Sequence, residues 1–110
     1  NGRLTLGENI GDNGGLHVAH YAYHLALNGA EAPALDGVTA EQRFFLSWGQ
    51  VWRELQRDEA MRNQVLSNPH SPSQYRCNGV VRNVDAWYDA FNVQPGDKLY
   101  LAPADRVLIW

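Results

Sequence analysis

The chain has 110 residues, of which 45% are hydrophobic and 19% charged, a composition typical of a folded globular domain. Its formal net charge is −3 and its Lys and Arg residues form no cluster, which argues against nucleic-acid binding and against polybasic attachment to a membrane. No segment approaches the roughly 18 consecutive apolar residues of a membrane span. The single cysteine, Cys77, cannot form an internal disulfide, so cysteine usage leaves the cellular compartment open.

Hydrophobic spacing and cap residues predict a mainly α-helical chain with about four helices. The first helix is expected over residues 6–28, directly before a glycine that suits a helix stop. Thr39 followed by Gln42 is a capping-box pattern and predicts a second helix that extends to about residue 55. Asp58 is a candidate N-cap for a shorter helix that ends near residue 66.

The second half of the chain has weaker signals. Residues 70–82 are interpreted as a loop with at most a brief strand, because turn residues surround a short apolar run. Asn83 is expected to cap a fourth helix with Val84, Trp87, Tyr88 and Phe91 on its apolar side. The tail over residues 99–110 is expected to be irregular and packed by four apolar side chains, Leu101, Val107, Ile109 and Trp110.

Glu8 and Asp12 are the first candidates for chemistry. Four residues apart on a helix, the two carboxylates share one face about 6 Å apart along the axis. Their repulsion favours a cation or a hydrogen-bond donor nearby, although a solvated acidic helix start is the simpler alternative. Gly11, Gly14 and Gly15 weaken that alternative, because each costs a helix interior about 1 kcal/mol and suggests close approach of another backbone.

The segment 7–15, Gly-Glu-Asn-Ile-Gly-Asp-Asn-Gly-Gly, resembles the Glu-x-x-x-Asp motif of the neprilysin-like (M13) zinc metallopeptidases, whose usual wording has Ala where this chain has Gly11. The resemblance continues in order through the Phe-Phe-Leu-Ser-Trp-Gly-Gln-Val-Trp segment at 44–52 and through His-Ser-Pro at 70–72. It ends with Arg76, Asn83, Ala90-Phe91 and the terminal Arg106 to Trp110. The resemblance implies that residues 1–110 are the C-terminal portion of a zincin (thermolysin-like) catalytic domain.

The resemblance implies a role for each matching residue. Glu8 matches the third zinc ligand of a site with two His and one Glu, and Asp12 matches the carboxylate that orients a zinc-bound His. His70 matches the histidine that donates a hydrogen bond to the oxyanion during attack on the peptide bond. Arg76 matches the arginine that binds a backbone carbonyl of the peptide substrate. The implied cofactor is one zinc ion, and the implied activity is metalloendopeptidase activity.

The family's other two zinc ligands and its general base belong to a His-Glu-x-x-His helix, and no such motif occurs in these 110 residues. We therefore expect that helix upstream of Asn1, in the remainder of the catalytic domain. The fragment alone is expected neither to hold zinc tightly nor to hydrolyse peptides. The disulfide cysteines of animal members are absent, with Arg53 and Asn92 near the corresponding places, which suggests a bacterial member, periplasmic, secreted or cytoplasmic.

Other residues have rival interpretations. His17, His20 and His24 lie within about 60° of one another on a helix, about 120° from the Glu8–Asp12 face. They form a second candidate metal cluster, against the simpler interpretation of a polar stripe facing solvent or a neighbouring lobe. Three smaller features are interpreted structurally: Cys77 as a packed thiol, Ser71 as a turn residue, and the aromatic residues Phe44, Phe45, Trp48 and Trp52 as helix core.

Without the family resemblance, the leading function would be a noncatalytic helical protein-interaction module with no metal site. A His-Glu-x-x-His motif upstream in the full-length protein would establish the peptidase function, whereas its absence would favour the interaction module.

Overall fold

The computed structural model describes residues 1–109, and this part of the chain is mainly α-helical, as predicted. Its helices are α1 (Gly2–Leu27), α2 (Ala40–Val51), α3 (Asp58–Ser67), α4 (Ser73–Val81) and α5 (Asp85–Phe91), followed by the 3₁₀-helix η1 (Pro103–Asp105). An isolated antiparallel bridge joins Leu35 and Val38 in the connection between α1 and α2. The prediction of about four helices is one fewer than the five α-helices of the described residues. Among the described residues, no helix combines the length and apolarity that a membrane crossing needs.

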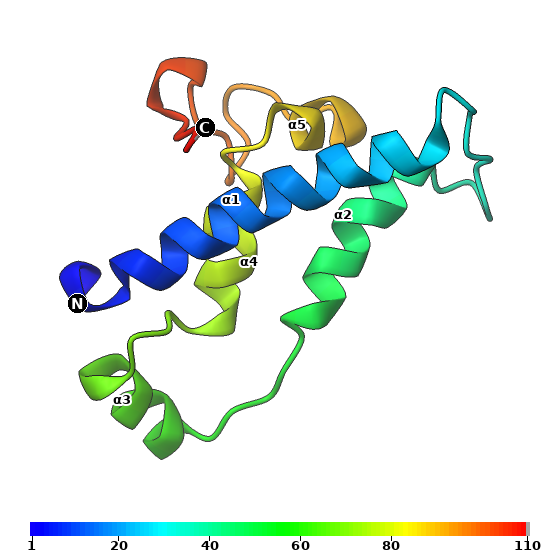
Figure 1. Cartoon of the computed structure of the whole chain (residues 1–110). Helices are drawn as coiled ribbons and strands as arrows, with labels where there is room; N and C mark the ends of the chain where they lie inside the picture. The colour runs from blue at the N-terminus through cyan, green and yellow to red at the C-terminus, as the bar shows by residue number, and fades with distance from the viewer. Residues whose placement is uncertain (110) are drawn as a thin grey trace.

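The helices meet around a small apolar core. Figure 1 shows α1 as one long helix that crosses α4, while α2 packs against α4 and α5. α3 stands apart from the other helices at the end of the connection from α2 (Figure 1). One buried cluster joins α1, α2, α4 and the start of α5, and its members are Leu16, Phe45, Val80, Val81 and Val84. Phe44 and Trp48 pack against this cluster, so the predicted core role of the α2 aromatic residues is confirmed for Phe44, Phe45 and Trp48.

The capping signals of the first two helices are confirmed. α1 ends at Leu27, its C-cap Asn28 has a left-handed φ of 48°, and Gly29 follows with a φ of 80°. In the capping box of α2, the Gln42 amide donates to Thr39 Oγ1 at 3.2 Å and the Thr39 amide donates to Gln42 Oε1 at 3.0 Å. α2 ends at Val51, earlier than the predicted residue 55.

The prediction of a loop over residues 70–82 is wrong, because residues 73–81 form α4. The local sequence did not predict this helix, since Gly79 and the β-branched Val80 and Val81 all have low helix propensity. Val80 and Val81 are buried in the core, and Arg76 on the same helix forms an ion pair with α1. Tertiary contacts therefore stabilise a helix that the local sequence does not favour.

Two predicted caps are also wrong. Asn83 does not cap α5, which starts after Val84 without a side-chain cap. Instead, Asn83 Nδ2 donates to the Gly79 carbonyl at 2.8 Å and Asn83 Oδ1 accepts from the Val107 amide at 2.8 Å, so this side chain ties the tail to α4. Asp58 is the first residue of α3 rather than its N-cap, which is Arg57.

The tail is attached to α5 mainly through Tyr88. Its hydroxyl donates to the Arg82 carbonyl at 2.8 Å and accepts from the Leu101 amide at 2.9 Å, and the Arg106 guanidinium carbon lies 3.5 Å from the ring centroid. Leu101 is partly buried, whereas Val107 is 53% exposed and so does not pack as predicted. Ile109 is partly buried as well, and Trp110 lies outside the described residues.

Two of the three glycines singled out in the first helix, Gly11 and Gly15, have more open surroundings than expected. A Cβ atom at Gly11 or Gly15 would meet nothing within 4 Å, so no other segment of the described chain approaches these positions closely. For Gly11 and Gly15 the close-approach interpretation is therefore wrong within residues 1–109, whereas Gly14 is buried.

Replacing Tyr88 by Phe should lower the free energy of unfolding by about 1–3 kcal/mol, because the Arg82 carbonyl and the Leu101 amide would both lose a partly buried partner. A urea titration of the chain measures this change. Tyr75→Phe is the matched control: Tyr75 is 64% exposed, and its change should stay within about 0.5 kcal/mol. Equal effects of the two substitutions would contradict the role of the Tyr88 hydroxyl.

Candidate functional site

The structure brings all four predicted site residues together. α1 carries Glu8 and Asp12 on one face, α4 carries Arg76, and the connection between α3 and α4 carries His70. Arg76 lies 64 positions from Asp12 in the sequence yet contacts it directly. The convergence follows from the packing of α4 across α1, which Figure 1 shows.

Asp12 and Arg76 form a two-pronged ion pair. Arg76 Nε donates to Asp12 Oδ2 at 2.6 Å, and Arg76 Nη2 donates to Asp12 Oδ1 at 2.7 Å. Both side chains are largely buried, with 11% of Asp12 and 16% of Arg76 exposed. The hydrogen bond to Asp12, together with the charges of Asp12 and Glu8, raises the pKa of Arg76 against the opposing effect of burial. The pair is a strong, directional contact between α1 and α4.

Arg76 retains donors for a further partner. A guanidinium has five N–H groups, and Asp12 accepts from only two of them. The guanidinium carbon lies 4.2 Å from the ring centroid of Trp52 at the end of α2, so the planar group is held by stacking as well as by hydrogen bonds. Trp52 was predicted as core, and its contact with Arg76 adds a role that the sequence did not indicate.

The carboxylate of Glu8 is more open to solvent. Its Oε2 lies 3.1 Å from His70 Nε2 and 3.9 Å from Arg76 Nη2, and the side chain is 44% exposed. The expected donor near the acidic pair is thus present, because Arg76 contacts both carboxylates. The Glu8 side chain thus remains partly exposed beside a largely buried ion pair, whereas the simpler interpretation placed both carboxylates in solvent.

Asn68 orients His70. Its Oδ1 accepts from the His70 backbone amide at 2.9 Å and lies 2.9 Å from His70 Nδ1. Because an amide oxygen only accepts, His70 Nδ1 carries a proton, and Nε2 is the ring nitrogen that faces Glu8. Sequence reasoning missed Asn68; the available signal was its position two residues before His70 in an Asn-Pro turn.

The segment around His70 is also attached to two helices. Ser71 Oγ donates to Asn9 Oδ1 on α1 at 2.9 Å, and Gln64 Nε2 on α3 donates to the carbonyls of His70 and Ser71 at 3.3 Å each. Ser71 therefore anchors the turn, in agreement with its structural interpretation. Cys77 is partly buried, and burial raises the pKa of its thiol, so the packed-thiol interpretation is confirmed.

Glu8 fits zinc as one ligand of an incomplete set. A catalytic zinc site takes three protein ligands, and a carboxylate oxygen is a suitable one. Among the described residues, the group of side chains close enough to share a metal is His20, His24 and Glu41, which excludes Glu8. Any zinc at Glu8 therefore needs further ligands from outside residues 1–109.

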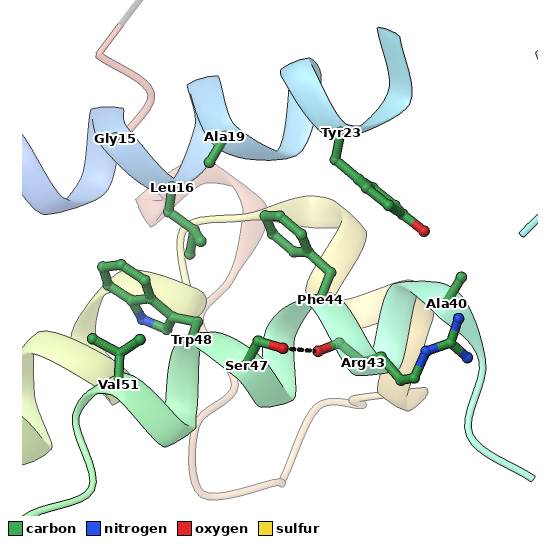
Figure 2. Close-up of a pocket in the computed structure, with 10 residues that line it drawn as sticks. All are labelled: Gly15, Leu16, Ala19, Tyr23, Ala40, Arg43, Phe44, Ser47, Trp48 and Val51. Atoms are coloured by element: carbon green, nitrogen blue, oxygen red, sulfur yellow. Dashed lines mark hydrogen bonds between the residues drawn. The ribbon is translucent and has the colours of Figure 1, made fainter. Parts of the chain in front are cut away.

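An apolar groove of about 460 Å³ runs between α1 and α2. Figure 2 shows Leu16 directed from α1 between Phe44 and Trp48 of α2, and Tyr23 directed toward the start of α2. The buried Trp48 Nε1 has no hydrogen-bond partner within the described residues. The groove is a second feature of α1 and α2 that this part of the chain leaves unfilled.

Comparison with known proteins identifies the family of this mainly helical chain. The sequence model of Peptidase family M13 matches residues 1–107, so the chain belongs to this family. Endothelin-converting enzyme 1 of Bos taurus is 41% identical over 114 aligned residues, which cover all of this chain. Neprilysin-3 of Drosophila melanogaster is 37% identical over the same length.

Solved structures agree with the fold. The zinc metalloprotease Zmp1 of Mycobacterium tuberculosis in its open state matches 99% of this chain with a TM-score of 0.96 and 53% identity. Zmp1 in complex with an inhibitor matches with a TM-score of 0.95. The predicted family membership and zincin-type fold are thereby confirmed. The chain spans only 15% of endothelin-converting enzyme 1 and 17% of Zmp1.

The Asp12–Arg76 pair should show an interaction energy of about 1–3 kcal/mol in a double-mutant cycle with Asp12→Asn and Arg76→Gln, because both groups are largely desolvated. Asp85–Arg106 is the matched control: its N–O distance is also 2.6 Å, but Asp85 is 82% exposed. Its interaction energy should stay below about 1 kcal/mol. Urea titrations of the single and double variants measure both; similar values for the two pairs would contradict the importance of burial.

Proposed function

We propose that this chain is the C-terminal part of the catalytic domain of a zinc metalloendopeptidase, and that it contributes Glu8, Asp12, His70 and Arg76 to the active site. The observation that carries the proposal is that Arg76 and His70 contact Glu8 and Asp12 at one face of α1. M13 membership and the likeness to the zinc metalloprotease Zmp1 support it. The higher identity with this bacterial protein than with the animal relatives supports a bacterial origin.

Glu8 is proposed as the third zinc ligand, with two histidines supplied by the remainder of the catalytic domain. Its side chain is 44% exposed and so is accessible to a metal, whereas both oxygens of Asp12 accept hydrogen bonds from Arg76. Zinc bound there supplies Lewis-acid activation of water for attack on a peptide bond. Each oxygen of Asp12 has a second lone pair, so Asp12 can accept from Arg76 and also from the ring N–H of a zinc-bound histidine.

His70 is proposed to donate a hydrogen bond to the oxygen of the peptide carbonyl as negative charge develops on it. Its Nδ1 donates to Asn68, and Nε2 is the ring nitrogen directed into the site, where it donates when both ring nitrogens carry protons. Arg76 is proposed to bind a substrate backbone carbonyl with the N–H groups that Asp12 does not use. Because Trp52 and Asp12 hold the guanidinium, little side-chain entropy remains to be lost on binding.

The isolated chain is proposed to be inactive, because one carboxylate ligand holds zinc weakly and the general base of the family is absent from the sequence. The apolar groove between α1 and α2 is a suitable surface for the remainder of the catalytic domain.

Glu8→Gln in the full-length protein should remove the zinc equivalent on which peptidase activity depends, because a neutral amide is a poor zinc ligand. Asp12→Ala should lower metal affinity or activity by about 10–100-fold. Metal analysis and peptide hydrolysis measure both effects. Glu59→Gln, on an exposed residue in the first turn of α3, is the matched control and should change neither. Unchanged zinc content and activity in Glu8→Gln would rule out the assignment of Glu8.

His70→Ala should lower kcat by about 10²–10³-fold with little change in KM, because its hydrogen bond forms only as the carbonyl oxygen gains charge. Arg76→Lys should instead mainly raise KM, since a lysine ammonium cannot reproduce the planar guanidinium that donates to Asp12 and to the substrate at the same time. Steady-state kinetics on a peptide substrate separate the two. The opposite pattern would exchange the two roles.

A further inference from the structure

Two histidines and one glutamate meet where α1 packs near the start of α2. His20 and His24 lie one turn apart on α1, and Glu41 lies in the first turn of α2. His20 Nε2 is 2.7 Å from Glu41 Oε2, His24 Nε2 is 2.8 Å from Glu41 Oε1, and the two Nε2 atoms are 3.2 Å apart. Two of the three histidines, His20 and His24, therefore contact a carboxylate from another helix rather than solvent alone.

The cluster differs from the group of three histidines that the sequence suggested. His17 Nδ1 lies 2.8 Å from the carbonyl oxygen of Asn13 on its own helix, and His17 is not part of the group that could share a metal. Glu41 takes its place as the third possible ligand. No spacing along α1 indicates Glu41, because it belongs to a different helix.

We propose that His20, His24 and Glu41 form a second metal site, which binds a divalent transition-metal ion such as zinc through two imidazole Nε2 atoms and one carboxylate oxygen. This donor set suits Zn²⁺, Co²⁺, Ni²⁺ and Cu²⁺. The site is distinct from the one at Glu8, because the separation of 12 positions from Glu8 to His20 corresponds to about 18 Å along the helix axis.

The distances suit a tetrahedral ion. Zinc–ligand bonds of 2.0–2.2 Å place neighbouring ligand atoms about 3.3 Å apart. The two Nε2 atoms, 3.2 Å apart, have this separation. Glu41 is at hydrogen-bond distance from each ring, so it needs to move outward by about 0.5 Å to share a metal. Its side chain is one-third exposed and on the first turn of a helix, where such a movement meets little resistance.

Aromatic neighbours hold the imidazole rings in place. The His20 ring stacks on Phe45 with 5.6 Å between ring centroids and packs edge-on against Phe44 at 5.2 Å. The His24 ring packs edge-on against Tyr23 at 5.4 Å. His20 is 18% exposed at its side chain, whereas His24 is 49% exposed. His20 would thus be the more tightly packed ligand of a bound metal, and His24 the more accessible one.

The surrounding charge favours a cation. The cluster lines an open groove of about 550 Å³ that also includes Asp89 and Thr39. With both imidazoles neutral, Glu41 and Asp89 give this groove two negative charges, and the described lining contains no Lys or Arg. The open side leaves room for water as a fourth ligand.

A metal at this position would join the C-terminal half of α1 to the start of α2 across the connection of residues 28–39. Because Glu8 and Asp12 belong to α1, such a clip would also restrain the helix that presents the proposed catalytic site. Its predicted role is structural, since it stabilises the contact between the two helices.

The test is metal analysis of the full-length protein after equilibration with zinc and removal of free metal by gel filtration. The wild-type protein should hold one metal equivalent more than His24→Gln and than Glu41→Gln, which replaces the carboxylate by an amide of the same shape. His17→Gln is the matched control on the same helix and should retain the wild-type metal content. Added zinc should raise Tm in the wild type and in His17→Gln more than in the two cluster variants.

Equal metal content in His24→Gln, Glu41→Gln and His17→Gln would overturn the proposal. The proposal would also be overturned if the Tm of the wild type and of all three variants depended on pH but not on zinc. The two histidines would then bind protons beside Glu41 but no metal. The comparison is independent of the proposed function, since it counts metal lost at His24 whether or not Glu8→Gln removes another equivalent.

Discussion

The ion pair between Asp12 and Arg76 is the contact on which the arrangement of this chain depends. It joins α1 to α4 through two short charge-assisted hydrogen bonds in a largely buried position, and the guanidinium lies over the ring of Trp52, the residue after α2. Without a cation here, Glu8 and Asp12 would repel each other on one face of α1. The same guanidinium thus allows two carboxylates to share a helix face and holds α4 across that face.

The side chains of the proposed site differ in burial. Asp12 and Arg76 are held by helices and by each other, whereas Glu8 and His70 are each more than 40% exposed. The turn that carries His70 is nevertheless bonded to α1 through Ser71 and to α3 through Gln64. Such bracing of a loop residue limits the reorganisation needed for catalysis, which is the main requirement for stabilising a developing charge.

α1 connects features that lie far apart. Its first half carries the proposed zinc ligand, its middle contributes Leu16 to the core, and its second half carries His20 and His24 beside Glu41. The backbone hydrogen bonds of this one helix keep these groups at a constant spacing. A restraint at one end of α1 acts on the orientation of the carboxylates at the other.

The sequence alone determined the features that depend on neighbouring residues. The capping box of Thr39 and Gln42, the stop after Asn28 and the shared face of Glu8 and Asp12 follow from local geometry, and the ordered motifs sufficed to indicate the family.

Only the tertiary structure decided the rest. α4 is a helix because its valines are buried and its arginine is paired with α1, and neither cause lies within its own sequence. Likewise, Asn83 bonds the tail instead of capping α5, and Glu41 replaces His17 beside His20. Contacts between residues far apart in the chain outweigh weak local propensities here, because burial and charge pairing contribute more free energy than helix preference does.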